Sequence, residues 1–147
     1  IAAQGGNMAG WSLYVGSDGK ARYHYNWFGH EHSVAVSARK LLPGRHVIVI
    51  DHAYDGGFGA GGDSVMSIDG KPVGHVRIER SVPVIFSISG ETFDVGLDSG
   101  AAVGDYPHIY RFTGLIHGVT LERLSEPSAQ VKELIADAEF RASLAVQ

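Results

Sequence analysis

The sequence contains no cysteine and no long hydrophobic run. Without cysteine, a disulfide framework, a thiolate zinc site and a cysteine nucleophile are all excluded. This composition fits a reducing compartment, and it does not exclude secretion. No apolar stretch approaches the roughly 18 residues that a membrane-spanning helix requires, so we expect no membrane insertion.

Positive charge is also scarce. The 12 lysines and arginines are outnumbered by 16 aspartates and glutamates, which gives a net charge of −4. The basic residues are spread along the chain without a run, and this argues against nucleic acid as a partner. A chain of 147 residues can bury roughly 70% of its unfolded surface, so we expect one domain with an ordinary hydrophobic core.

The clearest local pattern is a β-hairpin between residues 61 and 80. Apolar and polar residues alternate on both sides of Asp69 and Gly70, and an Asp-Gly pair supplies the positive φ angles of a tight hairpin turn. The alternation predicts a sheet with one packed side and one solvated side. The predicted packed side consists of Met66, Ile68, Val76 and Ile78.

Several other short segments have the composition of strands, with turn residues between them. We expect strands near residues 11–15, 21–27, 32–38, 46–54, 84–88 and 93–96, and an extended segment at 109–124 that is interrupted by two glycines. The segment 46–54 is β-branched on both faces, so we expect it near the centre of the fold. This pattern predicts a mainly β protein, an antiparallel β-sandwich or barrel.

Only the end of the chain has a helical period. Apolar residues recur at helical spacing from 127 to 144, and Ser125 or Ser128 is the expected N-cap. We therefore divide the chain into a β-sandwich over residues 1–124 and one C-terminal amphipathic α-helix over residues 125–147.

Six segments carry a resemblance to a known family when they are taken in order. They are AQGGNMAGWSLYV, YHYNWFG, HAYDGGFGAGGDSVMSIDGKPVG, RIERSVPVIFS, ETFDVGLDSGAAVGDY and FTGLIHGVTL. This series resembles the C-terminal region of long bacterial arylsulfatases. In that family an alkaline-phosphatase-like catalytic domain comes first, and a sandwich similar to concanavalin A-like, jelly-roll or laminin G-like domains comes last. The resemblance implies that this chain is a piece of a longer bacterial protein, cytoplasmic or periplasmic.

The resemblance also implies which catalytic parts the chain lacks. Sulfatases (sulfuric ester hydrolases) use a formylglycine made within a C/S-x-P-x-R motif and a divalent cation, which we expect to be calcium. Neither Ser81-Val82-Pro83 nor Ser125-Glu126-Pro127 continues to the required arginine. We therefore expect no catalytic residue and no cofactor here. The expected role is that of an accessory domain, with the sulfatase catalytic domain as its partner.

The resemblance further indicates an incomplete sheet. The family's sandwich carries an additional strand before the AQGG segment, and this chain lacks it. We therefore expect an unpaired strand edge, through which copies of the chain can associate.

A carbohydrate-binding module is the alternative function. Tyr23, Tyr25 and Trp27 alternate along one strand, as an aromatic platform for sugar rings would, and Asp55 lies in a neighbouring loop. Alternating aromatic residues belong more often to a core or to a domain interface, and we favour that role for them. A glycan thus remains an alternative partner.

Metal binding has two sets of candidates. Asp94, Asp98 and Asp105 lie in or beside loops, where sandwich domains hold calcium, but no D-x-D-x-D-G loop is present. His30 and His32 share one face of a strand, which is typical of a metal site only when a third ligand joins them. We predict no metal site from either set. The literal G-x-G-x-x-G at 57–62 precedes a strand instead of a helix, so we reject dinucleotide binding.

Overall fold

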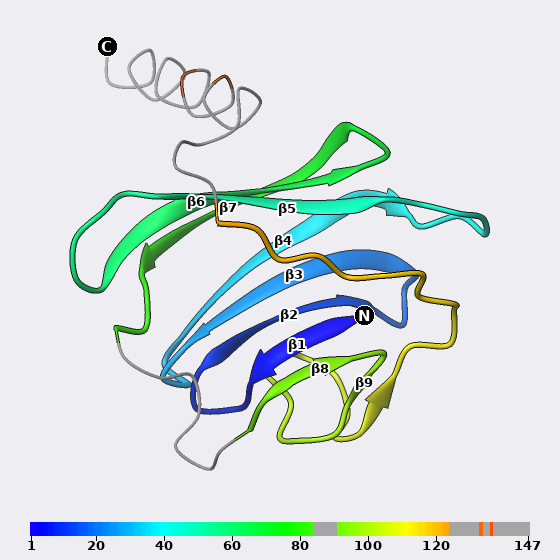
Figure 1. The fold of residues 1–147 in the computed structure, drawn as a ribbon, viewed down its shortest axis with the longest axis horizontal. Coiled ribbons are helices and arrows are strands. Elements are labelled where there is room, and N and C mark those ends of the chain that lie inside the picture. Colours follow the sequence, from blue (N-terminus) through cyan, green and yellow to red (C-terminus); the bar gives the residue numbers. More distant parts are fainter. Residues whose placement is uncertain (84–90, 124–132, 134–135, 137–147) are drawn as a thin grey trace.

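The computed structural model describes residues 1–83 and 91–123, together with Glu133 and Ala136. Within these residues the chain is mainly β, as predicted, and its three antiparallel sheets are consistent with a β-sandwich (Figure 1). The strand expected at 84–88 lies outside the described residues, and so does the helix expected over 125–147 apart from those two positions. No helix in the described part of the chain is long and apolar enough to cross a membrane.

The largest sheet has five strands in the order β4-β3-β2-β1-β8 (Figure 1). Their bounds are β1 Ala2–Gly5, β2 Gly10–Val15, β3 Lys20–Trp27, β4 Glu31–Lys40 and β8 Phe93–Val95. Strand β1 pairs with β2 on one side, and on its other side Ala3 lies opposite Asp94 of β8. The N-terminal strand therefore has a neighbour on both sides, and it is not the unpaired edge that the sequence predicted there.

The predicted hairpin belongs to a sheet of three strands in the order β5-β6-β7. Its bounds are β5 Ile48–Tyr54, β6 Ala60–Ile68 and β7 Lys71–Arg80. The turn lies at Asp69 and Gly70, whose φ angles are 51° and 76°, as a hairpin turn of this kind requires. Met66 and Ile78 are buried as predicted. Val65, on the opposite face of β6, is also buried, so the expectation of a fully solvated side is wrong for this central strand.

Among the described residues, strand β5 lies at an edge of its sheet and not at the centre. It pairs only with β6 among the described residues. Val49 of β5 is 41% exposed, and Val47, just before the strand, is 62% exposed. The prediction of a central strand at 46–54 is therefore wrong. A run of β-branched residues indicates a strand, but it does not determine how many neighbours that strand has.

The two larger sheets meet where β7 runs beside β4. Arg80 forms an ion pair with Glu31 at one end of this contact. Farther along, Gly74 lies so close to β4 that an added Cβ atom would be 3.1 Å from Val36 O. The core beneath this contact consists of Tyr23, Tyr25, Ala35 and Ile78. One face of the five-stranded sheet thus packs towards the hairpin.

The opposite face of the five-stranded sheet is covered by the chain that follows β8. This part contains β9 (Leu97–Asp98) and β10 (Tyr110–Arg111), which pair with each other. Tyr14 of β2 contacts Tyr106, with ring centroids 4.6 Å apart, and Tyr106 stacks on Tyr110 at 5.2 Å. Because both faces of β2 are covered, its polar residue Ser12 is buried as well.

Candidate functional site

The connection between β5 and β6 presents two aromatic side chains to solvent. Phe58 is 86% exposed, and Tyr54 at the end of β5 is 48% exposed. The loop contains three glycines with positive φ angles, and they are Gly56, Gly57 and Gly59. Glycine adopts such angles without strain, so the sequence Gly-Gly-Phe-Gly allows a tight connection that leaves Phe58 in solvent. We call residues 54–59 the aromatic loop.

Hydrogen bonds hold the aromatic loop in place. Asp55 N donates to Gly61 O at 3.0 Å, which closes the base of the loop. The Tyr54 hydroxyl donates to Gly57 O within the loop. The exposed rings are therefore attached to a fixed backbone, and binding through them requires little further ordering of the chain.

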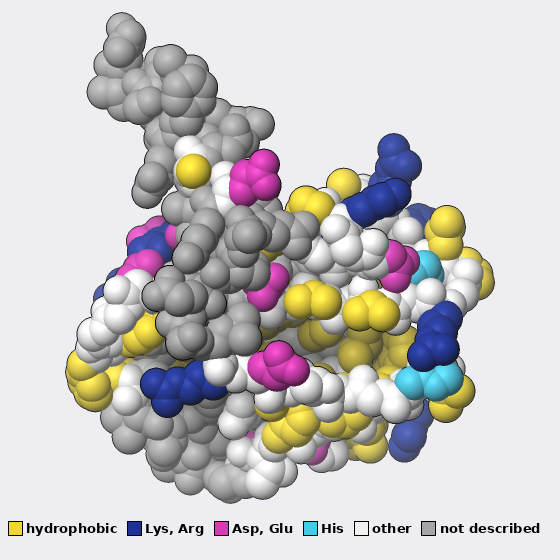
Figure 2. Space-filling view, turned by 45° about the horizontal axis from the view of Figure 1, so that its top comes forward, with side chains coloured by type: hydrophobic (Ala, Val, Ile, Leu, Met, Phe, Trp, Pro, Cys, Tyr) yellow, Lys and Arg dark blue, Asp and Glu magenta, His cyan; other side chains and the backbone are white. Residues whose placement is uncertain are grey.

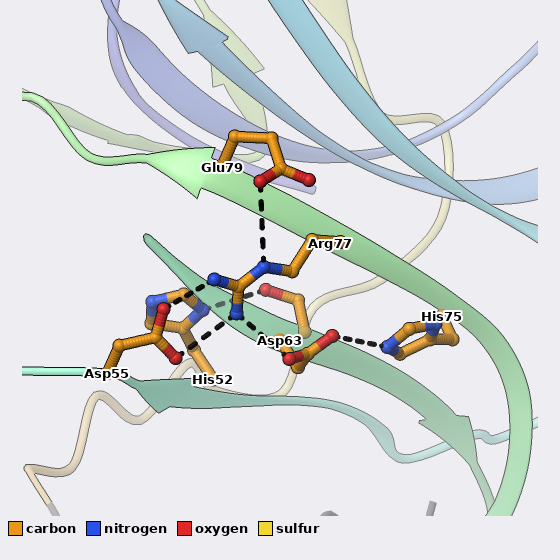
Figure 3. Close-up of polar contacts among 7 residues, drawn as sticks. His52, Asp55, Asp63, His75, Arg77 and Glu79 are labelled. Carbon is orange, nitrogen blue, oxygen red and sulfur yellow. Dashed lines mark hydrogen bonds and ion pairs between the residues drawn. The ribbon is translucent and has the colours of Figure 1, made fainter. Parts of the chain in front are cut away.

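A row of charged side chains ties the same loop to the hairpin (Figure 3). Arg77 Nη1 donates to Asp55 Oδ1 at 3.1 Å and to Asp63 Oδ2 at 3.0 Å. A second bond joins Arg77 Nη2 to Asp55 Oδ2, and Glu79 lies 4.0 Å from Arg77 Nε. Asp63 also binds His75 Nε2 at 2.8 Å. The row thus reaches from the loop across the outer face of β6 and β7.

Arg77 is the centre of this row, because its one guanidinium faces three carboxylates. The guanidinium of Arg77 lowers the pKa of the Asp55 carboxyl, so Asp55 stays ionised well into acid. Both side chains are about 40% exposed, and an ion pair in such a position stabilises a fold by about 1 kcal/mol or less. Asp55 thus ties the aromatic loop to Arg77, and its role in ligand binding stays a prediction.

The three aromatic candidates lie in or near the core. Tyr23 and Tyr25 are 7% and 6% exposed, and the Tyr25 hydroxyl accepts a hydrogen bond from Val82 N at 2.8 Å. Trp27 is half-buried, with the guanidinium of Arg80 4.2 Å from its ring centroid. These rings do not present a row of free faces, so their position favours the core role over a sugar-binding platform.

The aspartates proposed for calcium serve local hydrogen bonds. Asp94 Oδ2 accepts from Ser99 N at 2.8 Å, and Asp98 Oδ2 accepts from the Tyr106 hydroxyl at 2.5 Å. Burial raises the pKa of Asp98, which is 8% exposed, and thereby disfavours its charged form. Asp105 lies in the loop between β9 and β10. No three metal-ligating side chains converge anywhere in the described residues.

The structure does not bring the candidate metal-binding histidines together at one site. His32 Nδ1 lies 2.7 Å from Nε2 of His24 on β3, which is 4% exposed. His30 lies in the turn before β4 and does not join them, and Glu31 pairs with Arg80 instead. Burial, followed by the neighbouring His32, lowers the pKa of His24 from 6.5 to about 4. His24 is therefore a neutral imidazole at pH 7.

The lowered pKa of His24 predicts a loss of stability in acid. Because the pKa of His24 is lower in the folded chain than in the unfolded chain, its full contribution is present above pH 6.5 and disappears towards pH 4. We expect the free energy of unfolding to fall by about 2 kcal/mol over this range through His24, after screening by solvent. Urea denaturation between pH 7.5 and 4 measures it.

A matched pair of variants isolates that effect. His24→Gln should flatten the acid slope, whereas Leu42→Ser, at a position that is 70% exposed and does not titrate, should leave it unchanged. Parallel slopes for the wild type and His24→Gln would contradict a neutral buried imidazole at this position.

Comparisons with known proteins do not help to interpret this geometry. No family model, no curated protein and no solved structure matches the chain. The candidate site therefore rests on the side chains themselves.

Two residues of the site were not expected from the sequence. Arg77 is 22 positions from Asp55, and only the strand register brings them together. Phe58 did carry a signal, because an aromatic residue between glycines has no alternating apolar neighbours with which to enter a core. Such a residue is a candidate for exposure, and its exposure is the main feature of the site.

Proposed function

We propose that this chain is a non-catalytic accessory domain of an arylsulfatase, and that it packs on the catalytic domain of its parent protein. The ordered sequence motifs support the family. The observation that carries the packing role is the aromatic loop, which holds Phe58 in solvent on a fixed backbone.

An exposed phenylalanine on a held loop is suited to binding a protein. Burying such a side chain contributes about 1.5–3 kcal/mol, and aromatic residues dominate many protein interfaces. The ion pair between Arg77 and Asp55 fixes the base of the loop before binding. Further apolar side chains gather in a hollowed part of the surface in Figure 2. Exposed apolar area of this kind marks interaction sites.

The coding sequence upstream of Ile1 tests the family directly. We expect it to encode several hundred residues that include C/S-x-P-x-R. A start codon or a signal peptide close to Ile1 would contradict the proposal. The full-length parent protein should hydrolyse 4-nitrophenyl sulfate, whereas this chain alone should not.

Binding tests the packing role. The catalytic domain, expressed as a separate chain, should bind this chain in a calorimetric titration, and Phe58→Ser should weaken the Kd by roughly 10- to 100-fold. Leu42→Ser is the matched control, because Leu42 is 70% exposed but lies in the connection between β4 and β5. Equal losses in both variants would show that the aromatic loop is not the contact.

A carbohydrate-binding module remains the second candidate, and one observation favours it. The exposed rings of Tyr54 and Phe58 lie on either side of the carboxylate of Asp55 in the sequence, a combination that sugar sites use. Titration with neutral and sulfated oligosaccharides separates the candidates. Glycan binding that Phe58→Ser abolishes, with no binding of the catalytic domain, would favour the module over the accessory domain.

A further inference from the structure

The segment after β10 is extended, with a bend at Gly114, and it pairs with no strand among the described residues. Phe112 N donates to Gly96 O at 2.9 Å, and beyond it residues 113–123 make no backbone hydrogen bond to another described residue. In Figure 1 this segment is the orange line without an arrow that leads away from β10. Backbone donors and acceptors arranged along an extended chain are a template for pairing with another strand.

The side chains of this segment alternate between two sides. Leu115, Val119 and Leu121 are 79%, 39% and 65% exposed, and because they are separated by even numbers of residues they lie on one side of an extended chain. Ile116, on the other side, is half-buried, and its Cδ1 would be 3.6 Å from a Cβ atom added to Gly96. Phe112 and Ile116 thus contact the protein, and the two leucines and the valine of the other side form an apolar stripe towards solvent.

We propose that residues 112–123 form a dimer interface, in which this segment pairs antiparallel with the same segment of a second copy of the chain. Pairing would give partners to backbone groups that have none among the described residues, and it would bring two apolar stripes side by side. An interface of this kind is isologous, so each copy supplies both halves of every contact.

The sequence of the segment favours one register. With the two-fold axis at Gly118, Leu115 lies opposite Leu121 of the second copy, and His117 lies opposite Val119. Each copy's Arg123 then faces Thr113, so no two like charges are opposed. Moving the axis to His117 would place Arg123 opposite Arg111, which is destabilising. Gly118 has open space beside it, so a second backbone can approach there.

The net charge of each copy makes the association depend on salt. Two chains with a net charge of −4 repel each other, and added salt screens this repulsion. The dimer should therefore form more readily at 0.5 M than at 0.05 M sodium chloride. An interface held by surface ion pairs would show the opposite dependence.

Sedimentation equilibrium of the full chain tests the dimer. Between 1 and 200 µM we expect the mass to rise from 15.7 kDa to twice that value. The double variant Leu115→Asp, Leu121→Asp should weaken the Kd at least 30-fold, because the register places these carboxylates opposite each other. Leu42→Asp, at another exposed leucine, should not. A monomer at 200 µM, or a dimer that the double variant leaves intact, would overturn the proposal.

A charge-swapped partner tests the register. The double variant Leu115→Lys, Leu121→Lys should be monomeric alone and should form a mixed dimer with the aspartate variant. Failure of the two to combine would overturn the antiparallel register. This inference goes beyond the accessory-domain proposal and does not depend on it, since the catalytic domain is absent from the experiment.

Discussion

Replacing Ile78 with alanine should lower the free energy of unfolding by about 3–4 kcal/mol. Ile78 is 2% exposed, and it belongs to the core cluster with Tyr23, Tyr25 and Ala35. It lies on β7, whereas the other three lie on β3 and β4, so its side chain joins the two larger sheets. Removing three carbon atoms there would leave a cavity that neither sheet can fill without moving as a whole.

Urea denaturation followed by circular dichroism measures this loss. Val49→Ala is the control, because Val49 is 41% exposed and the same kind of truncation should cost less than about 1 kcal/mol there. If the two variants lose equal stability, Ile78 does not join the sheets as the structure indicates.

Gly61→Ala is the second substitution for which we expect a large loss of stability. The loss comes from a clash with backbone atoms. A Cβ atom added to Gly61 would be 2.1 Å from Ile78 O and 2.6 Å from Glu79 O. Both are backbone atoms of β7, so no side chain can rotate to make room. The hairpin would have to separate locally, and we expect a loss of more than about 3 kcal/mol or a chain that does not fold.

Gly118→Ala provides the comparison for this variant. Nothing lies within 4 Å of a Cβ atom added to Gly118, so alanine should change the stability by less than about 0.5 kcal/mol. Thermal unfolding at low protein concentration distinguishes the two variants. A stable Gly61→Ala protein would mean that β6 and β7 are farther apart here than the structure shows.

The strands with strong local signals were predictable from the sequence. Asp69 and Gly70 determine the turn through their own φ preferences, and alternation predicted the burial of Met66 and Ile78. The position of β5 was not predictable, because an apolar run carries no information on which strand pairs with it. The same reason explains the segment 112–123, where the sequence predicts extended chain but cannot supply a partner.

The candidate site was less predictable than the fold. Tyr23 and Tyr25 were identified as a pair on one face, and their sequence favoured the core role, which their burial supports. Asp55 was selected as a loop carboxylate, but its partner Arg77 depends on the register of three strands. Long-range contacts of this kind come from the assembled sheet, so no local pattern reports them.

The pairing of β1 with β8 has a consequence for how the chain folds. These strands come from opposite ends of the described sheet region, whereas β5, β6 and β7 are joined by short connections. During synthesis β1 to β7 can form before β8 exists, so one side of β1 stays open until the last part of the sheet arrives. Closing this long-range contact should be the slow step of folding, and until then the nascent chain exposes an edge that chaperones are suited to protect.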